Sequence, residues 1–395
     1  MSLDFQQIRE QVRQLGEEAP RREQRLRELR QQAGDLLSHH AHDLEKLQQK
    51  VEEVVRHHDP SLRCALPVRE ALTAHFALPA VPERAILLAA DGSQIYLDRH
   101  SAVEYFLINV GAIQMNLGGS DPPQLFYDSD LKYGDEIFRP DEYFSEEKIA
   151  FLRDLREREI LAELVEQVGQ PAAALIDGPI ELWGAREGSL EAGHSGQRGL
   201  QPYLEVLLRL HTQGASVAGY VDKPAEDHLV RLLEVASQPA AEAQKRPLFG
   251  VRDADLFRDL LAPGERSAVF EFQSRSARLY RQYHPAITLH FFYLNVGWDQ
   301  HPLLARVDAL ALVAEEAERL DQLHAVLVQQ CQIMGTRRYP YVLHRAHETA
   351  RVSLEDKAQL DMMIANELLS QGISGEMSQK QGVKNVSTQK GRFSL

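Results

Sequence analysis

Two aspartates follow apolar runs of strand length in this sequence. Residues 86–90 lead into Asp91-Gly92-Ser93, and residues 172–176 lead into Asp177-Gly178-Pro179. Short apolar runs closed by turn residues are typical of buried strands, so each aspartate would lie where a strand meets a loop. Two carboxylates on neighbouring strands would suit a hard cation such as Mg²⁺ or Mn²⁺. The alternative stays open, because Asp-Gly after an apolar run is also a common turn.

A second region, residues 337–348, combines cationic, aromatic and imidazole side chains that core packing explains poorly. It contains Arg337, Arg338, Tyr339, Tyr341, His344 and His347. On a helix, His344 and His347 would share a face. Zinc binding by that pair alone is weakly supported, because no third ligand is spaced nearby. A histidine in a polar loop, without any ligand, is the commoner outcome.

The elements that would position these groups alternate between strands and helices. Residues 86–119 indicate a β-meander, and residues 145–168 indicate a helix directly before the Asp177 strand. Further strands are expected at 216–221, 267–273 and 287–296, and an amphipathic helix at 320–334 that stops at Gly335. Strands separated by long helices predict an α/β protein with a mixed sheet.

Residues 1–60 carry helical periodicity without strand signals, with Leu44, Leu47, Val51 and Val54 on one stripe. We expect a helical, coiled-coil-like arm there, folded as a solvated antiparallel hairpin. A dimerisation arm, or a basic face that touches a DNA backbone, is the alternative. Residues 61–374 would form the main domain. The basic segment 375–395 has no periodicity, so we expect it to be disordered.

Composition limits the function classes. The 395-residue chain has a formal net charge of −14, 44% hydrophobic residues and two cysteines, Cys64 and Cys331. No apolar run reaches the roughly 18 residues of a membrane span, and the N-terminus is unlike a secretory signal. The cysteine usage fits a reducing cytoplasm. The acidic balance argues against extensive non-specific binding to nucleic acid, although a metal site itself requires surplus carboxylates.

The order of the motifs resembles the NurA family of DNA-end-processing nucleases. The resemblance lies in Asp91-Gly92-Ser93, in Asp177-Gly178, and in Tyr339-Pro340-Tyr341 leading into Ala346-His347, and it spans residues 86–369. It implies an RNase H-like mixed sheet flanked by helices and a manganese-dependent nuclease site. It also implies a homodimer that works with a HerA-type hexameric ATPase on DNA ends in double-strand-break repair, with 5′→3′ polarity.

By position, the resemblance implies that Asp91 and Asp177 bind metal, that His347 is the late histidine of the site, and that Tyr339 is the tyrosine before it. It also implies a glutamate on the helix that precedes Asp177.

Two glutamates of that helix are candidates, Glu157 and Glu159. We prefer Glu159, because it continues the face of Leu152 and Leu155, and Glu157 is kept as the alternative. Both cannot face the same site, since helical residues two apart diverge by about 200°.

Phosphodiester hydrolysis needs charge neutralised on the phosphate and a water activated near neutral pH, and two cations about 4 Å apart supply both. Asp91, Asp177 and Glu159 would hold Mn²⁺, with Mg²⁺ as the alternative. His347 would bind the metal or pass a proton to the leaving oxygen. Contacts to DNA are expected from Lys223, Arg337 and Arg338 on phosphates, and from Tyr339 on a phosphate or base.

The alternative function is a non-catalytic adaptor or DNA-binding scaffold for the ATPase. Its binding surface would come from exposed apolar side chains on the helices at 320–334 and 360–369, which are otherwise core. A preformed carboxylate cluster should gain thermal stability from Mn²⁺, which separates the two functions.

Overall fold

The computed structural model describes residues 4–97, 103–138, 144–169, 172–182, 196–298 and 300–373. The segment 375–395, which the sequence predicts to be disordered, lies outside these residues.

The chain forms two compact units. Unit 1 comprises residues 1–82, 178–181 and 218–340, and unit 2 comprises residues 83–177, 182–217 and 341–395. Both units are therefore assembled from separated stretches of the sequence. The domain boundaries expected at residues 60 and 375 stay predictions.

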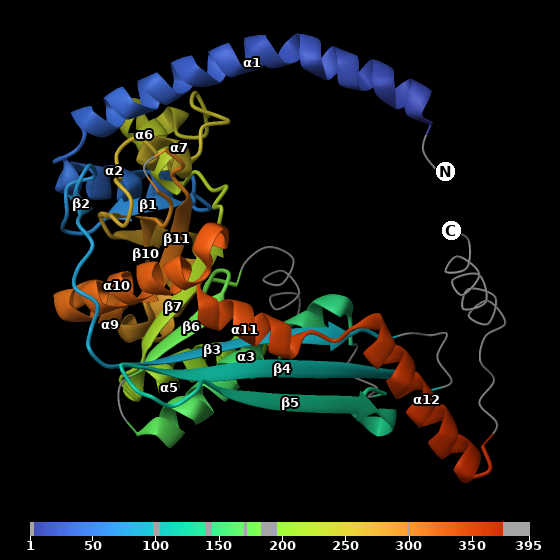
Figure 1. The fold of residues 1–395 in the computed structure, drawn as a ribbon. Helices are drawn as coiled ribbons and strands as arrows, with labels where there is room; N and C mark the ends of the chain where they lie inside the picture. The colour runs from blue at the N-terminus through green and yellow to red at the C-terminus, as the bar shows by residue number, and fades with distance from the viewer. Residues whose placement is uncertain are drawn as a thin grey trace. The chain divides into compact units, whose positions relative to one another are not determined.

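Unit 2 is built on a mixed sheet with the strand order β6-β3-β4-β5 (Figure 1). Strands β3 and β4 are antiparallel neighbours within the meander expected from residues 86–119. Strand β5, which lies beyond that range, pairs antiparallel with β4, and β6 pairs with β3 in parallel. The elements of this unit are β3 (Ala85–Ile95), β4 (Tyr105–Leu117), β5 (Gln124–Tyr133), η1 (Gly134–Glu136), α3 (Glu146–Val168), β6 (Ala173–Asp177), α5 (Gly196–Thr212), α11 (Tyr341–Ala350) and α12 (Leu354–Ser370).

Helices α11 and α3 pack on opposite faces of β3. Asp91 pairs with Gly111 of β4, and a Cβ atom on Gly111 would lie 2.4 Å from the Ala350 nitrogen of α11. A Cβ atom on the next residue of β3, Gly92, would lie 2.6 Å from Arg153 Cγ of α3. Successive residues of a strand point to opposite faces, so Asp91 faces α11 and Gly92 faces α3.

The sequence signals at the ends of α3 explain its bounds. The Ser145 hydroxyl accepts a hydrogen bond from the Lys148 N–H before the first turn, and Gly169 adopts a left-handed φ of 62° after the last. Both are standard helix-end devices. Between them the helix is buried on several sides, since Ile149, Ile160, Leu161 and Leu164 lie in the core together with charged residues described below.

Unit 1 contains antiparallel strands in the order β1-β9-β10-β11-β7, with β8 pairing β10 and β2. All seven residues of β10 are buried, as are all seven of β11. The elements are α1 (Phe5–His39), α2 (Leu44–His57), β1 (Cys64–Pro67), β2 (His75–Phe76), β7 (Ser216–Asp222, from Ala218 on), α6 (His228–Ser237), η2 (Ala240–Glu242), α7 (Asp253–Phe257), β8 (Arg266–Ser267), β9 (Phe270–Gln273), α8 (Arg275–Tyr283), η3 (Pro285–Ile287), β10 (Leu289–Asn295), β11 (Leu304–Leu310), α9 (Ala311–Glu315), α10 (Ala317–Ile333) and η4 (Gly335–Arg337).

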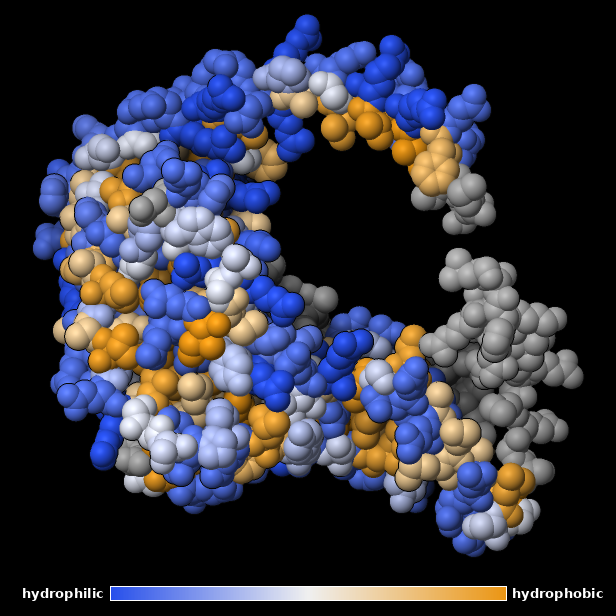
Figure 2. All heavy atoms as spheres, viewed as in Figure 1, coloured by the Kyte–Doolittle hydropathy of each residue, from blue (hydrophilic) through white to orange (hydrophobic). Residues whose placement is uncertain are grey.

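The two N-terminal helices differ in how they are buried. Leu47, Val51 and Val54 of α2 lie in the core, as their stripe indicates. Phe5, Val12 and Leu15 of α1 are exposed, and Figure 2 shows apolar surface along the N-terminal part of this helix. The hairpin arrangement of α1 and α2 stays a prediction.

The prediction of an α/β fold with a mixed sheet flanked by helices is confirmed. Helix α10 ends at Ile333 and is followed by Gly335 at φ +59°, close to the predicted stop. Each helix that the described residues form is either too short or too polar to span a bilayer.

Candidate functional site

The two aspartates identified from the sequence occupy equivalent places on adjacent strands of unit 2. The parallel register of β3 and β6 pairs Ala90 with Ile176, and Asp91 and Asp177 are the next residues on each strand. Residues that match in register point to the same face of a sheet. Both carboxylates therefore belong to the face that α11 covers.

Asp91 makes a direct contact with His347. The Nδ1 of His347 lies 2.7 Å from Oδ2 of Asp91, and the Gly92 N–H donates to Oδ1 at 2.9 Å. The Asp91 side chain is 17% exposed and the His347 side chain is 60% exposed. With the Nδ1 proton donated to the carboxylate, Nε2 is the ring nitrogen left to accept a proton or to bind a ligand.

Helix α11 is held in place to make this contact. Ala350, its last residue, lies against Gly111, where any larger residue would collide with the helix backbone. The Ala350 carbonyl accepts hydrogen bonds from Ser93 Oγ of β3 at 2.5 Å and from Asn109 Nδ2 of β4 at 2.7 Å. Ser129 of β5 in turn donates to Asn109 Oδ1 at 2.6 Å.

The structure places the two candidate glutamates of α3 differently. Glu157 is buried, with a side chain 6% exposed, and its Oε1 would lie 2.7 Å from a Cβ atom on Gly92, the residue after Asp91. Glu159 is 40% exposed and pairs with Arg156 at 3.2 Å. Glu157, rather than the preferred Glu159, therefore packs against β3 next to Asp91 in sequence. It lies on the face of β3 that α3 covers, whereas the Asp91 side chain lies on the face that α11 covers.

Glu157 belongs to a buried ionic cluster that we call the α3 cluster, consisting of Arg153, Asp154, Glu157 and Arg158. Arg153 contacts Asp154 at 2.6 Å and Glu157 at 3.2 Å, and Arg158 contacts Glu157. The Arg158 guanidinium also lies over the ring of Tyr203, 5.6 Å from its centroid.

Burial raises the pKa of Glu157 to about 8, although Arg158 and Arg153 oppose the shift. Every charge in this cluster has an opposite charge beside it, as buried ions require.

The remaining predicted residues belong to unit 1, whereas Asp91, Asp177 and His347 belong to unit 2. Tyr339 packs edge-on against Tyr220, with ring centroids 5.5 Å apart. Arg338 has a φ of 50° and lies 5.3 Å from the ring centroid of Trp298. Lys223 is exposed, 3.9 Å from Asp222, and Arg337 is exposed at the end of η4.

Apart from Ser93, which belongs to the Asp91-Gly92-Ser93 motif, the residues that hold the site together were not singled out by sequence patterns. Helix α11 is held by contacts with Gly111, Ser93 and Asn109. On the other face of β3, the charges of Arg153 and Asp154 neutralise each other. One signal was present, because an isolated glycine within a strand often marks a close approach of another backbone. Buried charged residues on a helix that also carries exposed charged residues, as α3 does, leave no such signal.

The donor atoms at this sheet end fit a divalent cation in kind. Asp91 and Asp177 offer carboxylate oxygens on one face, and His347 offers an imidazole nitrogen, which together suit Mn²⁺ or a similar metal. Within the described stretches, however, no three Asp, Glu, His or Cys side chains lie close enough to hold one ion. Of the four residues expected to bind metal, which are Asp91, Glu159, Asp177 and His347, the contact seen among the described residues is the one between Asp91 and His347.

Fold and site together define an α/β protein whose two site aspartates occupy matching places on adjacent parallel strands. The model of the NurA domain family matches residues 86–352, which contain Asp91, Asp177 and His347. The chain belongs to the NurA domain family. This membership supports a nuclease activity with DNA as the substrate.

Solved structures similar to this chain include the NurA nuclease from Sulfolobus solfataricus, at 10% identity over 83% of this chain and 96% of that chain, with a TM-score of 0.47. A structure of NurA with manganese matches at 11% identity over 74% of this chain and 91% of that chain, with a TM-score of 0.41. The catalytic domain of human Endonuclease V matches at 14% identity over 82% and 98% of the two chains, with a TM-score of 0.28. A comparison with curated proteins gave no match.

Proposed function

We propose that this chain is a manganese-dependent deoxyribonuclease whose site is centred on Asp91 and His347. The observation that carries the proposal is their 2.7 Å contact within β3, beside the equivalent place of Asp177, the last residue of β6. These residues lie 256 positions apart in the sequence, so the fold brings them together. Nothing in the packing of the core requires an exposed imidazole at this place.

The metal ligands in this proposal are Asp91, Asp177 and His347, and Glu157, in place of Glu159, is the glutamate that supports them from the α3 face of β3. Glu157 is preferred because its carboxylate packs next to β3 at Gly92, whereas Glu159 pairs with Arg156. Mn²⁺ is favoured over Mg²⁺ by the imidazole ligand. When bound, a metal pair supplies charge neutralisation on the phosphate and a water activated near neutral pH.

The chain's own groups contribute orientation and proton transfer. The Asp91 carboxylate holds the His347 ring through Nδ1, which leaves Nε2 either to bind the metal or, as the alternative, to exchange a proton with the reacting oxygens. The exposed position of His347 allows a DNA strand to reach it, and the fixed end of α11 keeps the ring in register with the sheet.

The finer parts of the proposal rest on the family resemblance. They are an RNase H-like arrangement, which the antiparallel β3-β4-β5 meander followed by parallel β6 supports, and action on DNA ends with 5′→3′ polarity in double-strand-break repair. They also include a homodimer and a HerA-type hexameric ATPase as partner, and DNA contacts from Lys223, Arg337, Arg338 and Tyr339.

The test is degradation of linear DNA by the purified protein with Mn²⁺. We expect the wild-type chain to degrade DNA, and Asp91→Ala to lose at least about a hundredfold in rate, since catalysis would lose both a ligand and the partner of the histidine. Asp128→Ala on β5 is a matched acidic control. The proposal fails if Asp91→Ala, folded normally, retains the wild-type rate.

The second candidate function is the non-catalytic adaptor, and one observation favours it. Of the two helices expected to supply its surface, α10 is largely buried, but α12 exposes Leu354, Met362, Met363 and Leu369. A thermal melt with Mn²⁺ separates the functions. A carboxylate site should stabilise the fold by about 2.7 kcal/mol at a metal concentration 100 times the dissociation constant. An unchanged melting temperature favours the adaptor.

A further inference from the structure

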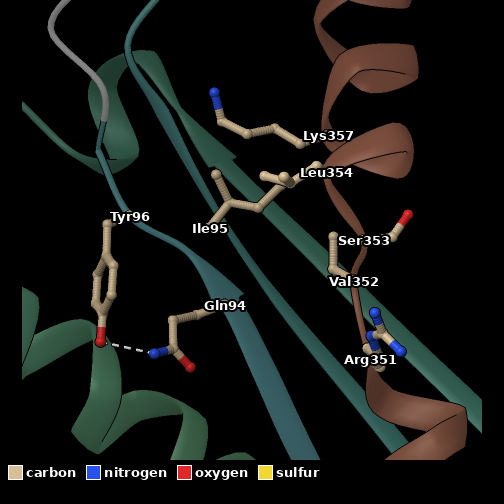
Figure 3. A pocket seen from close by; sticks show the side chains of 8 residues that line it. All are labelled: Gln94, Ile95, Tyr96, Arg351, Val352, Ser353, Leu354 and Lys357. Carbon is tan, nitrogen blue, oxygen red and sulfur yellow. Dashed lines mark hydrogen bonds between the residues drawn. The ribbon is translucent and has the colours of Figure 1, made fainter. Parts of the chain in front are cut away.

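Unit 2 contains a cavity of about 430 Å³ at the end of β3, but the polar groups that line it do not converge on one ligand (Figure 3). The Tyr96 hydroxyl accepts a hydrogen bond from Gln94 at 2.6 Å, Lys357 pairs with Asp361 at 3.4 Å, and Arg351 lies apart from both. Unit 1 is different, because exposed aromatic and cationic side chains lie together there.

Phe249 of unit 1 is an exposed aromatic side chain on a rigid turn. It is 73% exposed, although Leu248 before it and Val251 after it are 2% and 1% exposed. The Phe249 N–H donates to the Arg246 carbonyl at 3.2 Å, and the Val251 N–H donates to the Leu248 carbonyl at 3.1 Å. Gly250 has a φ of 102°, a conformation that glycine adopts without strain. The turn therefore presents the Phe249 ring to solvent in a fixed position.

Arg246 supports this ring from one side. Its guanidinium lies over the ring of Phe249, 5.9 Å from the centroid. The same guanidinium donates from Nη2 to Asp227 and from Nε to Glu234, both at 2.6 Å. Because two carboxylates already neutralise Arg246, it orients the ring rather than binding an anion from solution.

Three arginines without a carboxylate partner lie beside this turn. Arg22, Arg25 and Arg252 are exposed and form no ion pair within the stretches that the structure describes. Helix α1 touches the turn at Leu26, whose Cδ2 would lie 3.2 Å from a Cβ atom on Gly250. Arg22 lies one helical turn before Leu26 on the same face of α1, Arg25 is the next residue to Leu26, and Arg252 follows the turn. The aromatic ring and the three cationic groups therefore belong to one surface.

Two carboxylates next to these arginines are already used by other groups. Glu23 pairs with Arg27 at 3.4 Å and with Arg30 at 3.2 Å. Asp255 pairs with Arg30 at 3.5 Å and accepts a hydrogen bond from the Arg252 backbone N–H at 3.1 Å. The whole chain has 58 acidic residues against 44 lysines and arginines. An unpaired cationic surface in such an acidic protein indicates an anionic partner.

We propose that Phe249, Arg22, Arg25 and Arg252 bind a single strand of DNA. A base stacks on the Phe249 ring, and the phosphates beside it contact the three guanidinium groups. A duplex keeps its bases stacked inside the helix, so an exposed aromatic ring selects the single strand. The proposal rests on the nuclease function proposed above, because it assigns a second contact to the same substrate, away from the reacting groups.

The test measures binding of a fluorescein-labelled single-stranded oligothymidylate by anisotropy, in EDTA, over a range of salt concentrations. Phe249→Ala should weaken binding about tenfold with the salt slope unchanged, because stacking releases no counterions. Arg22→Gln and Arg252→Gln should each weaken binding about three- to tenfold and reduce the slope of log K against log salt by about 1. Phe249→Trp should bind at least as tightly as wild type, and the oligonucleotide should quench its added fluorescence.

Two variants are matched controls. Phe138→Ala removes a phenylalanine of unit 2 that is 62% exposed. Arg13→Gln removes an arginine of the same helix α1 that pairs with Glu10 at 2.7 Å and with Glu17 at 3.8 Å. Both should bind within about twofold of wild type, since a distant or neutralised charge contributes little at ordinary salt. Thermal melts identify any variant that is unfolded, and the quenching in Phe249→Trp then decides.

The results distinguish this proposal from the nuclease proposal. Wild-type binding by Phe249→Ala, or an equal loss in Phe138→Ala, overturns the assignment even if the wild-type protein cleaves DNA with Mn²⁺. A loss confined to the unit 1 variants supports the assignment even if cleavage is absent. A wild-type protein that does not bind the oligonucleotide overturns it outright. A dimer that dissociates in Phe249→Ala while binding is unchanged, as sedimentation would show, assigns the surface to a second copy of this chain instead.

Discussion

The two faces of β3 differ sharply at one pair of neighbouring residues. On the face of Asp91, the carboxylate meets a single exposed imidazole, and the contact lies open to ligands. On the face of Gly92, the α3 cluster is buried and each charge is compensated within it. A buried compensated cluster fixes geometry, whereas an exposed pair can exchange partners. We infer that α3 fixes the position of β3 from the buried face, and that α11 supplies the exposed histidine of the site.

The largest effect is expected from Gly111→Ala on the open face. Its new Cβ atom would lie 2.4 Å from the Ala350 nitrogen and 2.6 Å from the Thr349 carbonyl carbon, so the backbone of α11 has to move. A displacement of about 1 Å at a reacting group can reduce the rate about a hundredfold. Nuclease assays alongside thermal melts would measure this loss. A normal rate would show that the position of α11 is unimportant for activity.

The next effect separates the two glutamates of α3. Glu157→Gln should lower Mn²⁺-dependent cleavage about 10- to 100-fold, the usual range for losing support at a metal site. Glu159→Gln, on the same helix with the same change of charge, should leave the rate close to wild type. The reverse result would return the role to Glu159 and make the α3 cluster purely structural. The metal-induced shift in melting temperature provides an independent readout.

Gly92→Ala probes the buried face and should act on stability more than on activity. The added Cβ atom would contact Arg153 Cγ at 2.6 Å and Glu157 Oε1 at 2.7 Å, and both belong to side chains rather than backbone. Overpacking of this kind costs about 1–3 kcal/mol. Urea unfolding would measure the cost. A greater loss of activity than that of Gly111→Ala would reverse the assignment of the two faces.

The last prediction extends the comparison to a buried carboxylate of unit 1, where we expect little effect on activity and a dependence of stability on pH. Asp253 accepts hydrogen bonds from the N–H groups of Leu229 and Val230, both at 2.9 Å, and from the Tyr293 hydroxyl at 2.8 Å. Burial nevertheless raises the pKa of Asp253 to about 7, above its ordinary value of 3.8.

The folded protein therefore keeps this proton up to about pH 7, whereas the unfolded chain releases it near pH 4. The free energy of unfolding should fall as pH rises between these values, by at most about 4 kcal/mol. Asp253→Asn should remove this part of the slope in urea titrations at several pH values. Parallel curves for the two proteins would contradict the assignment.

The sequence was a good guide to individual strands and a poor one to their partners. The apolar runs before Asp91 and Asp177 predicted both strands, and Asp177 does end β6. The expected strand end at Asp91 is wrong, because β3 continues through Asp91-Gly92-Ser93 to Ile95. The parallel register of the two strands, and the contact between Asp91 and His347, join residues far apart in the chain. No local pattern encodes such contacts. The composition of residues 337–348 drew attention to His347, but only the family resemblance joined it to Asp91.

The choice between the glutamates shows why helix faces are hard to predict. Periodicity identifies a face by its apolar residues, but α3 buries Asp154, Glu157 and Arg158 alongside its apolar residues. The position of a charged residue along a helix does not show whether it is exposed or is buried beside an arginine that neutralises it. Leu152 and Leu155 therefore indicated Glu159, although the face that packs on β3 carries Glu157.

The row formed by Ser129, Asn109 and Ser93 crosses three strands and ends on the Ala350 carbonyl. Ser129 donates to Asn109, and Asn109 and Ser93 each donate to the Ala350 carbonyl, so the end of α11 is anchored to β5 through Asn109 as well as directly to β4 and β3. Ser129→Ala would remove a hydroxyl from β5, at the far end of this chain of bonds. Asn109 would then lose a hydrogen bond that orients its side chain. The position of the His347 imidazole, one turn before Ala350 on α11, would be less tightly fixed, although no residue that contacts the DNA has been changed.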